Sequence, residues 1–198
     1  MFSEPRTLDE TMRKILIFLL AAAALLAFAS CGGTVSDAEA REILGELIPK
    51  AEYFNEAFWG KGLPAEPGAV YDDSKKAVRQ YYDVSPDCPY QTMADLKAAA
   101  SEVYSREYME VITETILEGT DEFFPRYDEV DGVLRVDIAY EGYNLRSKLY
   151  PEQAKVVRSG MNLLEVDIPS DFDGEPAEDY RVTLVRESGR WLLDSPTY

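Results

Sequence analysis

The hydrophobic pattern of the chain changes from a helical period to a period of two at Val133, and this change constrains the fold more than any other feature. Before Val133, apolar side chains recur every three or four positions, as in amphipathic helices. After it, apolar and polar residues alternate over the runs 133–140, 154–157, 164–168, 180–186 and 190–193. Helices followed by strands predict an α+β fold in which N-terminal helices pack on a curved antiparallel sheet.

One long amphipathic helix is expected first. Ser36 and Glu39 are three residues apart and form a capping box, in which each side chain binds the other residue's backbone amide. Apolar residues then follow at helical spacing: Ile43, Leu44, Leu47, Ile48, Ala51, Phe54 and Phe58. We expect Pro49 to interrupt and kink this helix because proline removes a backbone donor, and Gly60 to close it.

Two shorter helices are expected before the change of period. Thr92 with Asp95 caps the second helix. Ser105 caps the third helix, which ends at Gly119. The helices therefore precede the run of strands in the chain.

Turn residues separate the alternating runs. They are Asp131 and Gly132, Ser159 and Gly160, Asp173 and Gly174, and Ser188 and Gly189. Such dipeptides favour tight hairpins, so neighbouring strands are expected to pair antiparallel. The first run is expected to bury one face, formed by Leu134, Val136, Ile138 and Tyr140.

Aromatic residues provide candidates for a ligand or partner surface. The connection 65–91 is long and rich in Pro, Asp and Tyr, with short strands expected at 69–71 and 79–84. Long loops in compact domains are often functional, so Tyr81, Tyr82 and Tyr90 are candidate surface residues. Trp59 is a further candidate, from an aromatic group on the first helix that comprises Tyr53, Phe54, Phe58 and Trp59. Core packing is the alternative for this group.

A leader precedes the first helix. Arg13 and Lys14 are positive, residues 15–29 carry no charge, and Ser30 is small. These are the parts of an export signal, and the apolar run is shorter than the roughly 20 residues of a permanent transmembrane helix. With Cys31 directly after it, the segment resembles the lipobox of bacterial lipoprotein precursors.

This resemblance implies that Cys31 is the lipid attachment site of a lipoprotein on the extracytoplasmic face of the cell membrane. The expected organisation is a signal peptide at 1–30, a lipidated tether at 31–35 and a single α+β domain at 36–198. Met1 and Met12 are both candidate start positions, which makes 1–11 a candidate start-site extension. Two acyl chains, such as palmitate, anchor a protein stably, and a tether of at most about 15 Å keeps the domain beside the bilayer.

Charge and cysteine content restrict the partners and the chemistry. The formal net charge is −17, so phosphate repulsion argues against binding to nucleic acid. The charge is explained by solubility or, alternatively, by a cationic partner. Once Cys31 is lipidated, only Cys88 remains, and no intramolecular disulfide is expected.

A second resemblance concerns the fold. The order of helices and strands looks like the cystatin-like and NTF2-like group. Segment 92–108, with Tyr104, Ser105, Glu107 and Tyr108, resembles exported Firmicutes proteins related to an inhibitor of cell-wall DL-endopeptidases. The closing hairpin 182–196 is similar to them as well. The resemblance implies a role in blocking a wall hydrolase by occupying its cleft, without assigning an inhibitory residue.

The sequence offers little enzyme chemistry. It contains no His, so Ser-His-Asp, Cys-His and His-metal arrangements are absent. Asp171, Asp173, Gly174 and Glu175 contain part of a calcium loop but lack its distal Glu, so we interpret them as a turn and expect no metal site and no cofactor. Paired carboxylates are the route to hydrolysis without histidine.

The sequence therefore predicts a lipid-anchored, non-catalytic binding domain of the cell envelope. Its expected partners are the membrane, through the anchor, and an envelope protein or wall-associated ligand. One alternative is an inhibitor or regulator of a cell-wall peptidase. A second alternative, from a different class, is a carboxylate-based hydrolase.

Overall fold

The computed structural model describes residues 34–66, 80–119, 125–140, 142 and 147–198. The fold below is that of the compact unit Val35–Tyr198. The predicted export signal, Cys31 and the strand expected at 69–71 lie outside the described residues.

The described part of the chain is a mixed α+β structure, which confirms the predicted class. Its helices are α2 (Asp37–Phe58), α3 (Met93–Ala100) and α4 (Arg106–Ile112), with a π-helical turn at Thr113–Leu117 and a 3-10 turn at Pro151–Gln153. Its strands are β1 (Tyr81–Asp83), β2 (Tyr127–Val130), β3 (Val133–Asp137), β4 (Ser147–Leu149), β5 (Lys155–Ser159), β6 (Leu163–Ile168), β7 (Ser170–Phe172), β8 (Glu175–Pro176), β9 (Tyr180–Glu187) and β10 (Arg190–Leu193).

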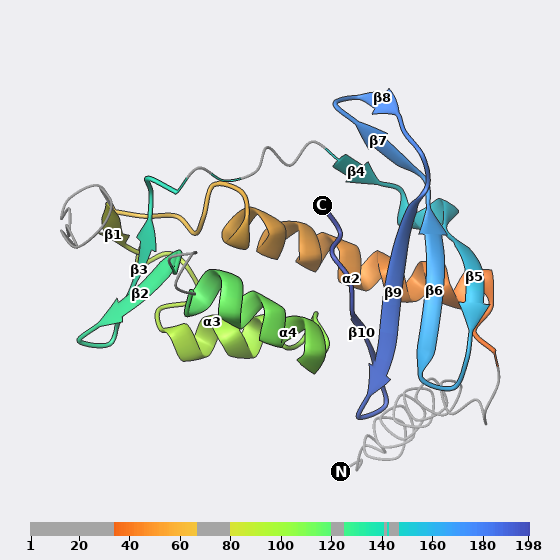
Figure 1. The fold of residues 1–198 in the computed structure, drawn as a ribbon, viewed down its shortest axis with the longest axis horizontal. Coiled ribbons are helices and arrows are strands. Elements are labelled where there is room, and N and C mark those ends of the chain that lie inside the picture. Colours follow the sequence, from red (N-terminus) through yellow and green to blue (C-terminus); the bar gives the residue numbers. More distant parts are fainter. Residues whose placement is uncertain (1–33, 67–79, 120–124, 141, 143–146) are drawn as a thin grey trace, which may run out of the picture. The chain divides into compact units, whose positions relative to one another are not determined.

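The strands form three antiparallel sheets rather than one (Figure 1). A four-stranded sheet has the order β10-β9-β6-β5, and two three-stranded sheets have the orders β1-β3-β2 and β4-β7-β8. The expectation of a single curved sheet is therefore wrong, because β3 pairs with β1 and β2 and not with the later strands. The four later runs predicted from the alternation do form one sheet.

Helix α2 is the longest element and packs against the four-stranded sheet at β5 and β10. Its predicted capping box is confirmed, since the Ser36 side chain accepts from the Glu39 amide and the Glu39 side chain accepts from the Ser36 amide. Ser36 holds the pKa of the Glu39 carboxyl below its usual value. The buried residues of α2 are Ala40, Leu44, Leu47, Ile48, Ala51, Phe54, Asn55, Ala57 and Phe58.

Helix α2 runs through Pro49 without a break, so the expected interruption is wrong. A proline inside a helix costs about 3 kcal/mol or more. Burial offsets this cost, since Leu47 and Ile48 before the proline and Ala51 after it all lie in the core. Packing of the two halves therefore holds the helix in one piece.

The caps of the two shorter helices are confirmed. Thr92 and Asp95 form a capping box at α3, and the Ser105 side chain accepts from the Tyr108 amide at the start of α4. The polypeptide continues from α4 through the π-helical turn to Gly119, whose φ is 72°. Local sequence chemistry thus locates both helix starts.

The predicted hairpin turns at Asp131–Gly132, Asp173–Gly174 and Ser188–Gly189 are confirmed. All six residues have positive φ, from 49° to 85°, as type I′ turns require. At the fourth predicted turn Ser159 still belongs to β5, and the turn begins at Gly160, whose amide donates to the Leu163 carbonyl at 2.7 Å.

Strand β3 differs from its prediction, because it buries polar as well as apolar side chains and ends at Asp137. Arg135 is only 9% exposed, and its Nε lies 3.0 Å from Asp83 Oδ1 on β1. Asp137 accepts from the Gln80 amide at 3.2 Å. Ile138, expected on the buried face, is 41% exposed. Polar contacts of Arg135 and Asp137 within the sheet therefore replace the expected alternation of buried apolar and exposed polar side chains.

Residues at the start of β2 cap the C-terminus of α2. The Tyr127 hydroxyl donates to the Ala57 carbonyl at 2.7 Å and accepts from the Leu63 amide at 3.1 Å. Arg126 donates from Nη1 to Phe58 O at 3.1 Å and from Nη2 to Gly60 O at 2.7 Å. Its guanidinium also lies over the Tyr140 ring, 4.3 Å from the centroid. Carbonyls that a helix end leaves without partners are thus satisfied by another element.

We expect Tyr127→Phe to lower the free energy of unfolding by about 1–3 kcal/mol, because it leaves the buried Leu63 amide and Ala57 carbonyl without their partner. Urea unfolding followed by circular dichroism measures the change. Tyr82→Phe is the matched control, since no hydrogen bond of the Tyr82 hydroxyl is found within the described residues. Equal stability of the two variants would contradict this account of the cap.

Candidate functional site

Two of the four predicted surface residues are buried and do not form a contact surface. Tyr81 is 5% exposed, and its hydroxyl donates to the Pro125 carbonyl at 2.7 Å. Trp59 is also 5% exposed and stacks on Tyr198, with ring centroids 4.4 Å apart. Their role as a ligand surface is therefore corrected to core packing, which was the alternative for the aromatic group on the first helix.

The other two predicted surface residues are half-buried and lie on different parts of the fold. Tyr82 is on β1 opposite Val136 of β3. Tyr90 packs against α2, with its ring centroid 6.0 Å from that of Tyr53 and 5.9 Å from that of Phe54. The structure therefore joins Tyr90 to the aromatic face of α2 and leaves Tyr82 outside this group.

Tyr90, Tyr53 and Phe54 line a hollow of about 550 Å³ between α2 and the region of α3. Its other lining residues are Pro49, Lys50, Ala99, Glu102 and Val103. Tyr53 is 42% exposed, so an aromatic edge is open to solvent here. Apolar walls with a few polar groups are typical of ligand-binding hollows.

A second hollow of about 250 Å³ adjoins the first. It is lined by Ile43, Glu46, Leu47, Lys50, Glu102, Arg190, Trp191 and Leu192. Lys50 and Glu102 line both hollows. We call the two together the α2 groove, because one helix supplies a wall of each.

The α2 groove follows from the spacing of residues on α2. Ile43, Leu47, Lys50 and Phe54 recur at intervals of three or four, which places them on one face of the helix. The opposite wall comes from α3 and the residues after it, and from β10. An ion pair between Arg190 and Glu102 joins these two parts of the wall.

The hydroxyl groups beside the α2 groove are held in their neutral form. Burial raises the pKa of Tyr53 to about 12, and the neighbouring Cys88 thiol contributes to the rise. Burial likewise raises the pKa of Tyr90. Cys88 itself is only 6% exposed. The aromatic end of the groove thus offers neutral hydroxyls and apolar surface.

A buried polar network lies at the C-terminal end of α2. Asn55 is 4% exposed, and its Nδ2 donates to Thr197 Oγ1 at 3.0 Å. The Tyr104 hydroxyl donates to Asn55 Oδ1 at 3.2 Å. Tyr180 donates to the Tyr198 carbonyl at 3.2 Å. These contacts tie the segment 197–198 to α2 and have a structural role.

A hollow of about 260 Å³ beside this network is lined by Glu52, Asn55, Glu56, Lys148, Leu149, Thr197 and Tyr198. Glu52 and Glu56 lie one helical turn apart, and both are exposed to solvent.

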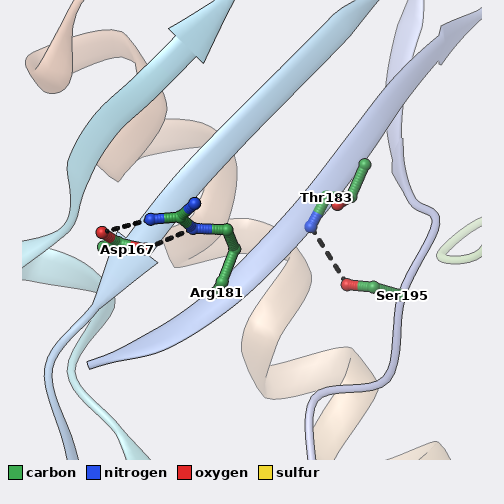
Figure 2. A network of polar contacts seen from close by, with 4 residues as sticks. All are labelled: Asp167, Arg181, Thr183 and Ser195. Atoms are coloured by element: carbon green, nitrogen blue, oxygen red, sulfur yellow. Dashed lines mark hydrogen bonds and ion pairs between the residues drawn. The ribbon is translucent and has the colours of Figure 1, made fainter. Parts of the chain in front are cut away.

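The outer face of the four-stranded sheet is polar. Figure 2 shows Arg181 on β9 donating from Nε and Nη2 to the two oxygens of Asp167 on β6, at 2.7 and 2.9 Å. These hydrogen bonds hold the pKa of Asp167 below its usual value. The Thr183 amide donates to Ser195 Oγ at 3.0 Å, which extends the pairing of β9 beyond the end of β10. Both contacts brace the sheet.

The residues of the partial calcium loop form the β7-β8 hairpin, in agreement with their interpretation as a turn between strands. Asp171 accepts from the Tyr150 hydroxyl at 2.5 Å. Within the described ranges, no group of three His, Cys, Asp or Glu side chains is placed to hold a metal ion. No helix among the residues that the structure describes has the length and apolar character needed to cross a membrane.

Comparison with known proteins adds no family assignment: no family model matches the chain, and no curated protein matches it.

Tyrosines with raised pKa values predict that stability falls in alkaline solution. Burial raises the pKa of Tyr53 to about 12 and also raises those of Tyr104, Tyr108 and Tyr127. An unfolded tyrosine has a pKa of about 10. Their stabilising contribution is therefore complete below pH about 10 and declines as the pH rises towards 12, since the unfolded chain loses its phenolic protons first.

Urea unfolding at several pH values between about 9 and 12 measures this decline. We expect the midpoint to fall steadily over this interval, and Tyr108→Phe to make the fall shallower. A midpoint that stays constant up to pH 12 would show that these hydroxyls are not held neutral by the fold.

Proposed function

We propose that the protein is a lipid-anchored, non-catalytic binding module on the extracytoplasmic face of the cell membrane. The α2 groove carries this proposal, because it combines an apolar floor, open aromatic edges and a few charged groups. Such surfaces recognise ligands by shape and apolar contact. The envelope location rests on the leader and Cys31, which lie in the sequence before the folded unit.

The finer fold proposed is cystatin-like or NTF2-like. Support comes from one long helix packed on a four-stranded antiparallel sheet, in which β5, β6, β9 and β10 lie side by side in the order in which they occur along the chain. In such an arrangement the helix covers one sheet face. The margins between the helix and its neighbours are then the places where a ligand can enter.

A narrower candidate function is inhibition or regulation of a cell-wall peptidase. Two segments carry the resemblance to exported inhibitor-related proteins, 92–108 and 182–196. Ala99 from the first and Trp191 from the second both line the α2 groove. The peptidase would then be the partner that contacts this surface.

The anchor is tested by metabolic labelling with a fatty acid. We expect Cys31→Ser to abolish the label and to release or mislocalise the protein, because the thiol that carries the diacylglyceryl group is gone. Cys88→Ser is the control, and it should keep both label and location, since Cys88 is a buried free thiol. Labelling that survives in the Cys31 variant would refute the assignment.

The α2 groove is tested by photo-crosslinking in the native envelope. We expect p-benzoylphenylalanine in place of Ala99 to give a discrete crosslinked product, because Ala99 lines the groove. The same probe in place of Ala98 is the matched control, since Ala98 is the preceding residue of α3 and is exposed outside the groove. Products of equal strength at both positions, or none at either, would count against the groove as a binding site.

A further inference from the structure

We propose that the hairpin formed by β5, β6 and their turn is the surface that the anchored domain applies to the bilayer, with anionic lipid headgroups as its partner. This inference rests on the proposed lipid anchor at Cys31. It goes further, because it states which face of the domain meets the membrane and by what chemistry.

The first observation is where the folded unit begins. The Val35 amide donates to Ser159 Oγ at 2.7 Å, at the end of β5. Asp37 Oδ1 accepts from the Val156 amide at 2.8 Å, which fixes the start of α2 to the same strand. The chain therefore enters the domain along the outer edge of β5.

The second observation is the length of the tether. Val35 is four residues after Cys31, so their Cα atoms are at most about 15 Å apart. Because Val35 is held at Ser159, a lipid on Cys31 would limit how far the end of the hairpin can lie from the bilayer. An anchor of this length brings the β5-β6 hairpin to the membrane surface and leaves little room for another face of the domain to contact the bilayer.

The third observation is the surface chemistry of the hairpin. Residues 154–163 contain Lys155 and Arg158 and no acidic residue, although the chain as a whole carries a net charge of −17. Both basic side chains are exposed, and the side chain of Arg158 is 67% exposed. Basic residues next to a membrane are attracted to anionic headgroups.

Exposed apolar side chains accompany these charges. Met161 in the turn is 73% exposed, and Val157 in the irregular part of β5 is 46% exposed. Apolar side chains beside basic ones suit the boundary between headgroups and acyl chains. A hairpin with this composition contacts an anionic bilayer more favourably than the acidic remainder of the surface.

Neighbouring acidic residues do not reverse the basic character of the β5-β6 hairpin. Glu165 Oε1 lies 4.0 Å from Arg158 Nη1, and Asp167 forms an ion pair with Arg181. Asp37 accepts from the backbone of β5 and lies at the edge of the hairpin. The turn residues Gly160, Met161 and Asn162 carry no charge and extend beyond these pairs.

The test uses the acylated protein reconstituted into vesicles of phosphatidylcholine with phosphatidylglycerol. A fluorophore is attached at Met161→Cys in a Cys88→Ser background, where the acylated Cys31 does not react. Phe172→Cys is the matched control, because Phe172 is 56% exposed on the β7-β8 hairpin. That hairpin follows the far end of β6, away from the β5-β6 turn (Figure 1). Brominated lipids quench a fluorophore that reaches the bilayer.

We expect brominated lipid to quench the label at 161 and to leave the label at 172 nearly unchanged. Charge reversal by Lys155→Glu with Arg158→Glu should remove most of the quenching at 161. Lys61→Glu with Lys148→Glu changes the net charge equally outside the hairpin and should leave it intact. Equal quenching at the two labels, or stronger quenching at 172, overturns the proposed orientation.

Mass spectrometry and vesicle flotation of the same samples separate the two proposals. Acylated protein that floats with the vesicles but shows no preferential quenching at 161 overturns the orientation and leaves the anchor standing. Protein without acyl groups that stays in solution overturns the anchor, and this inference with it.

Discussion

The fold depends on the attachment of both ends of α2 to strands. At its N-terminus, Asp37 binds the edge of β5 and the capping box satisfies free amides. At its C-terminus the last turn holds no basic residue, and Arg126 from the start of β2 supplies the positive charge that a helix dipole favours there. Burial lowers the pKa of Arg126, but an arginine remains protonated in proteins. One helix thereby links the four-stranded sheet to the β1-β3-β2 sheet.

Sequence chemistry predicts the parts of this fold that are local. Capping residues and the Asp-Gly and Ser-Gly turns act within a few positions, so α3, α4 and the β9-β10 hairpin follow from short segments. Pairing between distant segments is not local. Strand β2 contains the charged residues Asp128 and Glu129, so its sequence lacks the alternation that would predict its pairing with β3. Strands β4, β7 and β8 are too short to give a periodic signal. The burial of Trp59 by stacking on Tyr198 joins residues far apart in the chain, and no pattern near Trp59 indicates it.

For the same reason, only some of the residues that line the α2 groove could be predicted from the sequence. The sequence shows the aromatic residues Tyr53, Phe54 and Tyr90 directly. It does not show that Ala99, Glu102 and Trp191 lie beside α2, because only tertiary packing brings their segments there. The small Ala99 and the large rings of Tyr53 and Tyr90 line the same hollow. The Arg190–Glu102 ion pair spans the opposite wall. An apolar hollow of this kind exposes surface that a ligand can cover, and covering it is favourable because water is released.

The β5-β6 hairpin and the α2 groove are related through the four-stranded sheet. Leu163 at the start of β6 pairs with Val185 near the end of β9, so the β5-β6 and β9-β10 turns lie at the same end of the sheet. Trp191 lies directly after the β9-β10 turn, so in the proposed orientation it lies at the end of the groove nearer the membrane, and Tyr90 lies at the other end. An anionic bilayer attracts Lys155 and Arg158 and repels the acidic remainder of the domain, so the two effects favour the same orientation. In that orientation a ligand would meet the Tyr90 end first and reach Trp191 only near the lipid surface. This geometry suits a partner that is itself held at the membrane.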